Sequence, residues 1–125
     1  MSLARPMNYG YHVLDLETGV RWKVVFRDAG KWILGIYIPE ITSREEVKVL
    51  ERHNAPELFV LVKGKVTLVV ANGNVIKEVK MELGKPYVVT GWHNAYRPEG
   101  SEGVVLVVER DAVKTEFRRV EDFKA

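Results

Sequence analysis

The part of the chain that decides the fold runs from Glu57 to Lys80 and reads ELFVLVKGKVTLVVANGNVIKEVK. It contains valine-rich runs at residues 57–62, 66–71 and 75–80, each of which has the length of a β-strand. Lys63-Gly64-Lys65 separates the first two runs, and Asn72-Gly73-Asn74 separates the last two. Glycine and asparagine readily adopt the left-handed conformations of tight turns. The stretch therefore predicts three strands joined by two hairpins.

Similar runs extend this pattern in both directions along the chain. The further predicted strands lie at residues 11–16, 20–27, 32–39, 47–52, 87–90 and 104–109. The first three are separated by Glu17-Thr18-Gly19 and by Asp28-Ala29-Gly30-Lys31, which are both favourable turn sequences. Short strands with turns at intervals of about 8–12 residues are typical of a β-sandwich or barrel. We therefore expect an all-β protein.

The C-terminal segment fits two kinds of secondary structure. Val113, Phe117 and Val120 follow a helical spacing that Phe123 extends, whereas residues 114–120 could instead form an edge strand. We favour a short C-terminal helix.

Length and composition restrict the class of protein. A chain of 125 residues has room for one domain, residues 1–125, and 46% hydrophobic with 29% charged residues is usual for a soluble globular protein. The 19 Lys and Arg are interspersed with 17 Asp and Glu. Because this leaves no basic stripe, we expect neither nucleic acid nor a membrane surface as a partner. The longest apolar stretches have strand length, so we expect no transmembrane span.

The residue types that are present and absent also bear on the cellular location and the growth temperature of the source. The absence of cysteine excludes a disulfide framework and a thiolate metal site. The first ten residues lack the apolar core of a secretory signal, so we expect a cytoplasmic location. Glutamine is also absent while Glu, Lys, Arg and Val are abundant, a trend found in proteins of thermophiles.

Two of the three histidines lie in polar positions beside apolar strands. His53 belongs to the segment ERHNAPE, in which Pro56 marks the entrance of the next strand, and His93 belongs to TGWHN. Glu51, His53 and Glu57 have the same parity, so in strand geometry they would face one side. The third, His12, has no chemical partner nearby in the sequence, and we expect a structural or surface role for it.

These residue types suit a metal site. Two neutral imidazoles and one carboxylate form the facial triad that holds Fe(II) and leaves coordination positions open. With Glu51 as a fourth ligand, the set suits Mn, Fe, Ni or Zn better than Cu(I). Such an ion could polarise a substrate oxygen, or activate water or dioxygen. The alternatives are hydrogen-bonded loop histidines, a Glu57 that faces solvent at the rim of a barrel, and a solvated, salt-bridging Glu51.

Residues around the second histidine are candidate ligand contacts. Trp92 could form a wall of a ligand pocket or pack in the core, and Asn94, Tyr96 and Arg97 could donate hydrogen bonds to an anionic or hydroxylated ligand. Arg97 could equally pair with a nearby glutamate.

Two segments together resemble the cupin family. His53-x-x-x-Glu57, followed by Gly64, resembles the second half of the first cupin motif. The stretch from Gly84 to Trp92-His93-Asn94 resembles the second motif. The resemblance covers roughly residues 51–94 and implies a double-stranded β-helix, the cupin jelly-roll barrel, with a metal site inside.

Within this resemblance, His53, Glu57 and His93 match three family ligands and would also be the catalytic residues. The chain departs from the family pattern in that Glu51 replaces the first histidine and Arg97 replaces the asparagine after the second motif. Metal-free cupins arise by the loss of such ligands.

Three functions are compatible with this sequence. The first is a metal-dependent enzyme, an oxygenase, isomerase or lyase, that acts on a small polar organic molecule. The second is a metal-free isomerase or epimerase of a nucleotide sugar, with His53 as the base, Glu57 as the orienting group and Arg97 or Tyr96 as the ligand contact. The third is a non-catalytic module that binds a small molecule. Small cupins usually dimerise, and edge strands at both chain ends favour a homodimer.

Overall fold

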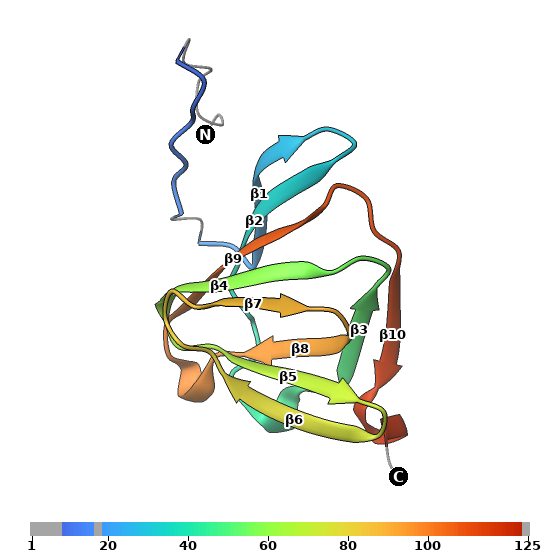
Figure 1. The fold of residues 1–125 in the computed structure, drawn as a ribbon. Coiled ribbons are helices and arrows are strands. Elements are labelled where there is room, and N and C mark those ends of the chain that lie inside the picture. The colour runs from blue at the N-terminus through green and yellow to red at the C-terminus, as the bar shows by residue number, and fades with distance from the viewer. Residues whose placement is uncertain (1–8, 17–18, 124–125) are drawn as a thin grey trace.

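A computed structural model describes residues 9–16 and 19–123 of the chain, and these residues form two five-stranded antiparallel sheets (Figure 1). The first sheet has the strand order β1 (Trp22–Asp28), β2 (Trp32–Tyr37), β9 (Gly103–Arg110), β4 (Glu57–Gly64) and β7 (Pro86–Val89). The second sheet has the order β10 (Thr115–Arg119), β3 (Val49–His53), β8 (Trp92–Tyr96), β5 (Thr67–Asn72) and β6 (Val75–Lys80). Three 3₁₀-helices connect or end the strands, namely η1 (Arg44–Glu46), η2 (Pro98–Gly100) and η3 (Val120–Phe123).

The period-two alternation of the strands builds the space between the sheets. In β4, Glu57, Phe59 and Leu61 are buried while the residues between them are partly exposed, and β9 buries Val105 and Val107 in the same way. These apolar side chains form one core cluster. Glu57 is the polar member of the same buried row, so a carboxylate is held among core residues.

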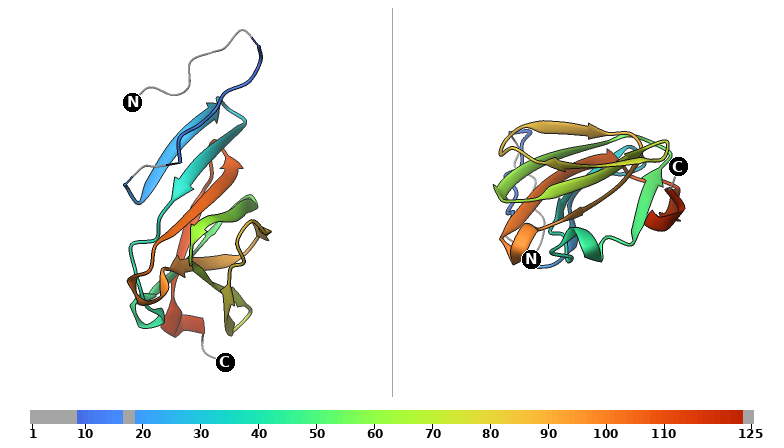
Figure 2. Two further views of the ribbon diagram at one scale, coloured as in Figure 1. Left: turned by 90° about the vertical axis from the view of Figure 1, so that its left-hand side faces the viewer. Right: turned by 90° about the horizontal axis from the view of Figure 1, so that it is seen from below.

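A second apolar cluster combines side chains on the other face of β3, β5 and β8 with residues next to the strands of the second sheet. Val47, Leu50, Val69, Tyr96 and Phe123 form this cluster, which includes one residue of η3. Figure 2 shows η3 at the end of the molecule farthest from the β1–β2 hairpin.

The prediction of an all-β jelly roll is confirmed, but one of its two central hairpins is wrong. β5 and β6 pair through the turn at Gly73, as expected. β4 and β5 lie in different sheets, so Lys63-Gly64-Lys65 is a crossover between the sheets. Gly64 has φ 72°, and a methyl group on its Cα would overlap the backbone carbonyl of Glu102. The glycine is thus required by a close approach of two backbones rather than by a hairpin turn.

Both ends of the chain differ from the prediction. Residues 11–16 form no strand, and the predicted turn at 17–19 lies largely outside the described residues. The C-terminal segment is the edge strand β10, paired with β3, and only η3 at its end is helical. The predicted helix over residues 113–123 is therefore wrong except for its last turn. Within the described ranges, no helix has the length and apolar character needed to cross a membrane.

Candidate metal site

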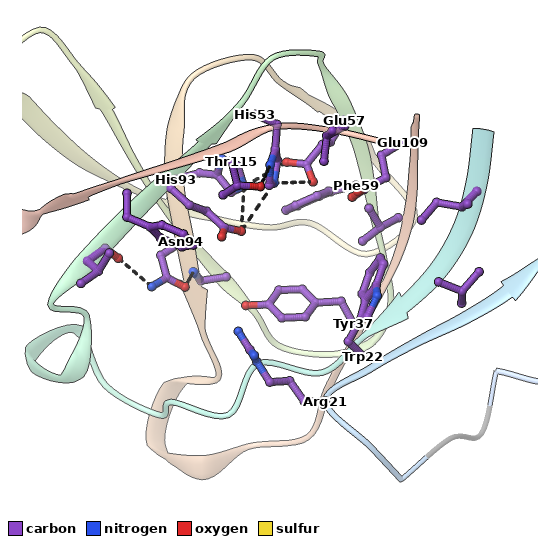
Figure 3. A pocket seen from close by; sticks show the side chains of 18 of the residues that line it. Arg21, Trp22, Tyr37, His53, Glu57, Phe59, His93, Asn94, Glu109 and Thr115 are labelled. Atoms are coloured by element: carbon purple, nitrogen blue, oxygen red, sulfur yellow. Dashed lines mark hydrogen bonds and ion pairs between the residues drawn. The ribbon is translucent and has the colours of Figure 1, made fainter. Parts of the chain in front are cut away.

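A cavity of about 460 Å³ opens between the two sheets. Strands β3, β8 and β10 of the second sheet and β1, β2, β4 and β9 of the first contribute side chains to its wall (Figure 3). The four metal ligands expected from the sequence, Glu51, His53, Glu57 and His93, all line this cavity.

The strand register explains why these side chains meet. Glu51 and His53 lie two residues apart on β3, and Glu51 lies directly opposite His93 of β8. Glu57 begins β4 on the other sheet, directly after Pro56, which marks the strand entrance as predicted. Three candidate ligands thus come from one sheet, and the fourth faces them from the other.

The four side chains converge to contact distance. The Nε2 atom of His93 lies 2.9 Å from Oε2 of Glu57, and Nε2 of His53 lies 3.3 Å from Oε1 of the same carboxylate. Oε1 of Glu51 lies 3.6 Å from Nε2 of His53 and 3.7 Å from Nε2 of His93. One ligand atom each from Glu51, His53 and His93 lie within 4.8 Å of one another, which is close enough to share one ion.

Each histidine is held by its other ring nitrogen. Nδ1 of His93 lies 2.8 Å from the carbonyl oxygen of Gly91, and because a carbonyl can only accept, Nδ1 carries the proton of this bond. Nδ1 of His53 lies 2.9 Å from Oγ1 of Thr115, on β10. When Nδ1 donates in this way, the lone pair of Nε2 in the neutral ring is free for a metal. Both Nε2 atoms face the same carboxylate.

The Glu57 carboxyl provides the test of whether a cation fits. The residue is 5% exposed, and burial of a carboxylate costs on the order of several kcal/mol unless the group is paired or coordinated. Its Oε2 atom is close to His93, yet it forms no hydrogen bond of normal geometry within the described part of the chain. A buried oxygen without an aligned donor, beside two ring nitrogens, matches the needs of a divalent ion.

A further carboxyl, Glu109 on β9, lines the same cavity and was missed in the sequence. Burial raises the pKa of Glu109, and the adjacent Glu57 carboxylate adds to this effect, so that the pKa reaches about 8. Burial also acts to raise the pKa of Glu57, but the close approach of His93 and Glu109 and the charge of the nearby histidines outweigh it, and the pKa is lowered. Glu57 is therefore ionised at neutral pH while Glu109 keeps its proton.

The Glu57 carboxylate also affects the pKa of His93. Burial acts to lower the pKa of His93, but the adjacent Glu57 carboxylate and the hydrogen bond with the Gly91 carbonyl outweigh it, and the pKa is raised. A raised pKa favours the protonated ring, so a proton competes with a metal ion for Nε2 of His93. A metal ion would have to displace this proton, so metal affinity should increase with pH.

Replacing Glu109 with glutamine is expected to reduce the loss of stability that the metal-free protein shows as pH rises. In the unfolded chain the carboxyl loses its proton near its ordinary pKa of 4.5, whereas in the folded chain it keeps the proton to about pH 8. Folding therefore retains a proton between these values, and stability falls as pH rises through them. Glutamine remains neutral throughout. Urea denaturation in chelator at about pH 5 and about pH 9 measures the effect, and equal pH dependence in both proteins would contradict it.

Replacing Thr115 with valine is expected to weaken metal binding about tenfold to a hundredfold, because residues that orient a ligand have effects of this size. Valine has nearly the same shape but cannot bond Nδ1 of His53. Thr115→Ser, which keeps the hydroxyl, is the matched control and should bind metal nearly as well as the wild type. Calorimetric titration with Zn²⁺ measures the affinities, and an unchanged affinity in the valine variant would remove this role for Thr115.

Two of the predicted ligand contacts lie outside the cavity. Trp92 and Tyr96 have the opposite strand parity to His93 and pack with the second apolar cluster. The Trp92 ring contacts Phe123 at a centroid distance of 5.7 Å, and the Tyr96 hydroxyl donates to the carboxylate of Glu78. Period-two alternation applied to β8 would have placed them on the outer face.

The other two predicted contacts, Asn94 and Arg97, form hydrogen bonds with backbone groups. Asn94 lines the cavity, but its amide donates to the carbonyl of Val49 and accepts from the N–H of Ala95, which bridges β8 to β3. The Arg97 guanidinium donates to the carbonyls of Pro39, at 2.6 Å, and Ser101, at 2.8 Å. Both side chains thus have backbone partners, and their contact with a ligand stays a prediction.

His12 also lies apart from the cavity wall. Its ring contacts Phe26 at a centroid distance of 5.8 Å. This placement agrees with the structural role expected for it.

Comparison with known proteins identifies the architecture. No protein-family model and no curated protein sequence matches the chain. Among solved structures, a cupin-2 domain protein from Shewanella frigidimarina superimposes with a TM-score of 0.54 at 14% identity, over 71% of this chain and 78% of that one. The chain has the cupin fold.

Two further cupin-fold neighbours are enzymes by name. Hydroxypropylphosphonic acid epoxidase from S. wedmorenis has a TM-score of 0.58 at 15% identity, over 69% of this chain and 48% of the epoxidase. The polyketide cyclase RemF from Streptomyces resistomycificus has a TM-score of 0.56 at 14% identity, over 90% of this chain and 84% of the cyclase. This chain thus spans about half the length of the epoxidase. At these identities the likeness shows the fold alone.

Proposed function

We propose that this cupin binds one divalent metal ion and uses it to bind and transform a small polar organic molecule. The ligands would be Nε2 of His53 and His93 with the carboxylates of Glu57 and Glu51. The observation that carries the proposal is the buried Glu57 carboxylate, whose Oε2 lacks an aligned donor and lies 2.9 Å from Nε2 of His93. The same carboxylate faces the second imidazole across 3.3 Å.

The donor set restricts the metal. Two imidazole nitrogens and two carboxylate oxygens suit Mn, Fe, Ni or Zn. Glu51, in place of a histidine, adds a second negative charge, so the two carboxylates balance the charge of a divalent ion. When bound, such an ion supplies Lewis-acid polarisation of a substrate oxygen. Oxygenase, isomerase and lyase chemistry are all compatible with this activation.

The rest of the cavity supports small-molecule chemistry. Its volume of about 460 Å³ lies in the usual range for small-molecule sites, which is about 300–1,000 Å³. Phe59 and Val107 give it an apolar wall next to the candidate ligands, and Glu109 holds a proton beside Glu57. The solved neighbours include the epoxidase (HppE) with Co(II) and with Fe(II), each in complex with substrate. These neighbours support the proposal through shared architecture.

The two other candidate functions have less support. The metal-free sugar isomerase relied on Arg97 or Tyr96 as the ligand contact, and both lie outside the cavity wall. A non-catalytic binding module would use the same cavity and ion, and detected turnover of any bound molecule would exclude it.

We also propose that the chain forms a homodimer, because β1 and β10, near the two chain ends, are edge strands. A single-domain organisation and a cytoplasmic location stay predictions.

The test is a metal inventory of the protein expressed without a polyhistidine tag, since such a tag binds metals itself. Elemental analysis should find close to one equivalent of a single divalent metal, and chelated protein should regain one equivalent on titration. Protein that holds no metal as purified and binds none on titration would overturn the proposal.

A further inference from the structure

The candidate ligands occupy one side of the cavity, and a cationic side chain lines the other. Arg21 directly precedes β1, and the next residue, Trp22, pairs with Tyr37 at the end of β2. Arg21 therefore lies next to Tyr37, at the end where the adjacent strands β1 and β2 pair. Figure 3 shows the Tyr37 hydroxyl directed into the cavity and the Arg21 guanidinium on the same side, across from His53 and Glu57.

The Tyr37 hydroxyl is available to a ligand. Tyr37 is half-buried in the cavity wall, and no hydrogen bond from its hydroxyl to another described residue is present. A tyrosine hydroxyl that faces a cavity without a protein partner can form its hydrogen bond with a ligand there. Burial raises the pKa of Tyr37 to about 12, so the hydroxyl keeps its proton and can donate.

Within residues 9–16 and 19–123, the Arg21 guanidinium has an ion pair with Glu40. Its ion pair with Glu40 joins Nε to Oε1 at 3.2 Å, and the side chains are 62% and 71% exposed. Exposed ion pairs of this kind contribute little free energy. The pair leaves the terminal amino groups of the guanidinium for a further acceptor, and a guanidinium matches carboxylate and phosphate oxygens in a bidentate manner.

Aromatic rings connect the two sides. The ring of Tyr37 contacts that of Phe59 at a centroid distance of 6.4 Å, and the Phe59 ring contacts that of His93 at 5.9 Å in an edge-on arrangement. A ligand between Arg21 and the candidate metal ligands would thus lie over an apolar floor. This arrangement suits a short carbon chain with a polar group at each end.

We propose that Arg21 and Tyr37 form an anion subsite, so that the ligand carries a carboxylate or phosphate-type group at one end and a metal-binding oxygen at the other. The inference rests on the proposed metal site, because the metal fixes the far end of the ligand. The anionic group accepts hydrogen bonds from the Arg21 guanidinium and the Tyr37 hydroxyl. Its charge distinguishes the ligand from neutral alcohols and sugars of similar size.

The experiment compares matched probes on the untagged protein loaded with one equivalent of Zn²⁺. The probes are 3-hydroxypropanoate, its neutral counterpart 1,3-propanediol, and 2-hydroxyethyl phosphate, each titrated by calorimetry. At least one anion should bind about tenfold to a hundredfold more tightly than the diol, as charge-assisted hydrogen bonds imply. The ratio between the two anions then assigns the preferred group as carboxylate or phosphate.

Variants locate the source of this preference. Arg21→Gln should remove most of the advantage of the anion without changing Zn²⁺ affinity, and Arg21→Lys should retain part of it. Tyr37→Phe keeps the ring packing and should weaken anion binding several-fold. Arg119→Gln is the matched control, because Arg119 is exposed, lies outside the cavity wall and changes the net charge equally.

Three outcomes would overturn the inference. These are equal affinity for the diol, an unchanged anion preference in Arg21→Gln, and no anion binding at tens of millimolar. An unchanged anion preference in Arg21→Gln would show that the anion binds the metal directly. An absence of anion binding would show that the cavity takes no anion. A Zn²⁺ titration of the same sample separates these results from a failure of the metal site itself.

Discussion

A His93→Ala variant should lose stoichiometric metal binding, with an affinity at least about a hundredfold below that of the wild type. Residues that merely orient a ligand change metal affinity by about tenfold to a hundredfold, so removal of a ligand should exceed this. His93 is 4% exposed, and its Nε2 lies 2.9 Å from the Glu57 carboxylate. Its loss also leaves that buried carboxylate without its closest partner. Calorimetric titration of the untagged protein measures the change.

The chain offers a matched control for this experiment. His12→Ala removes the one histidine outside the cavity and should leave metal affinity unchanged. If the His93 variant fails to fold, Glu57→Gln provides the second test, because glutamine keeps the shape of the side chain but lacks the negative charge. Retention of full metal affinity by either folded variant would refute our ligand assignment.

A Gly64→Ala variant should be destabilised by about 3 kcal/mol or more, through backbone strain and steric overlap together. A left-handed conformation costs a non-glycine residue about 1–2 kcal/mol, and Gly64 has φ 72°. The added methyl group would also overlap the carbonyl of Glu102, which accepts a hydrogen bond from Lys65 at 2.7 Å. Displacing that backbone disturbs the point where the chain crosses between the sheets. Thermal unfolding should show a midpoint lower by about 10 °C or more.

Gly73 provides the control, since it has φ 62° but no atom lies within 4 Å of the position that an added Cβ would take. Gly73→Ala should therefore cost only the conformational part, about 1–2 kcal/mol. Equal losses in the two variants would mean that the close approach to Glu102 contributes nothing.

The sequence predicts the strands well because β-branched residues alternate along them. It does not predict which strands pair, and the hairpin at Gly64 failed for this reason. The C-terminal segment shows a second limit. Val113 and Phe117 are four residues apart, a spacing that fits both a helix and one face of a strand. Both side chains line the cavity, as an extended segment allows.

The site was predictable to the extent that it lies within one strand. The shared parity of Glu51 and His53 places both on the inner face of β3, whereas the link to His93 came from the chemistry of a two-histidine, one-carboxylate ligand set and from the cupin resemblance. Glu109 has the parity of the buried residues Val105 and Val107, which was a usable signal. Thr115 could not be found in this way, because the pairing of β10 with β3 is visible only in the fold.

The division of the candidate ligands between two sheets affects the stability of the protein and its resistance to proteolysis. An ion held by Glu57 on one side and by His53 and His93 on the other would cross-link the two halves of the barrel. Binding to the folded state alone adds about 4 kcal/mol of stability when free metal exceeds the dissociation constant about a thousandfold. The supply of metal in the cell would then set how long the polypeptide survives proteolysis as well as whether it is active.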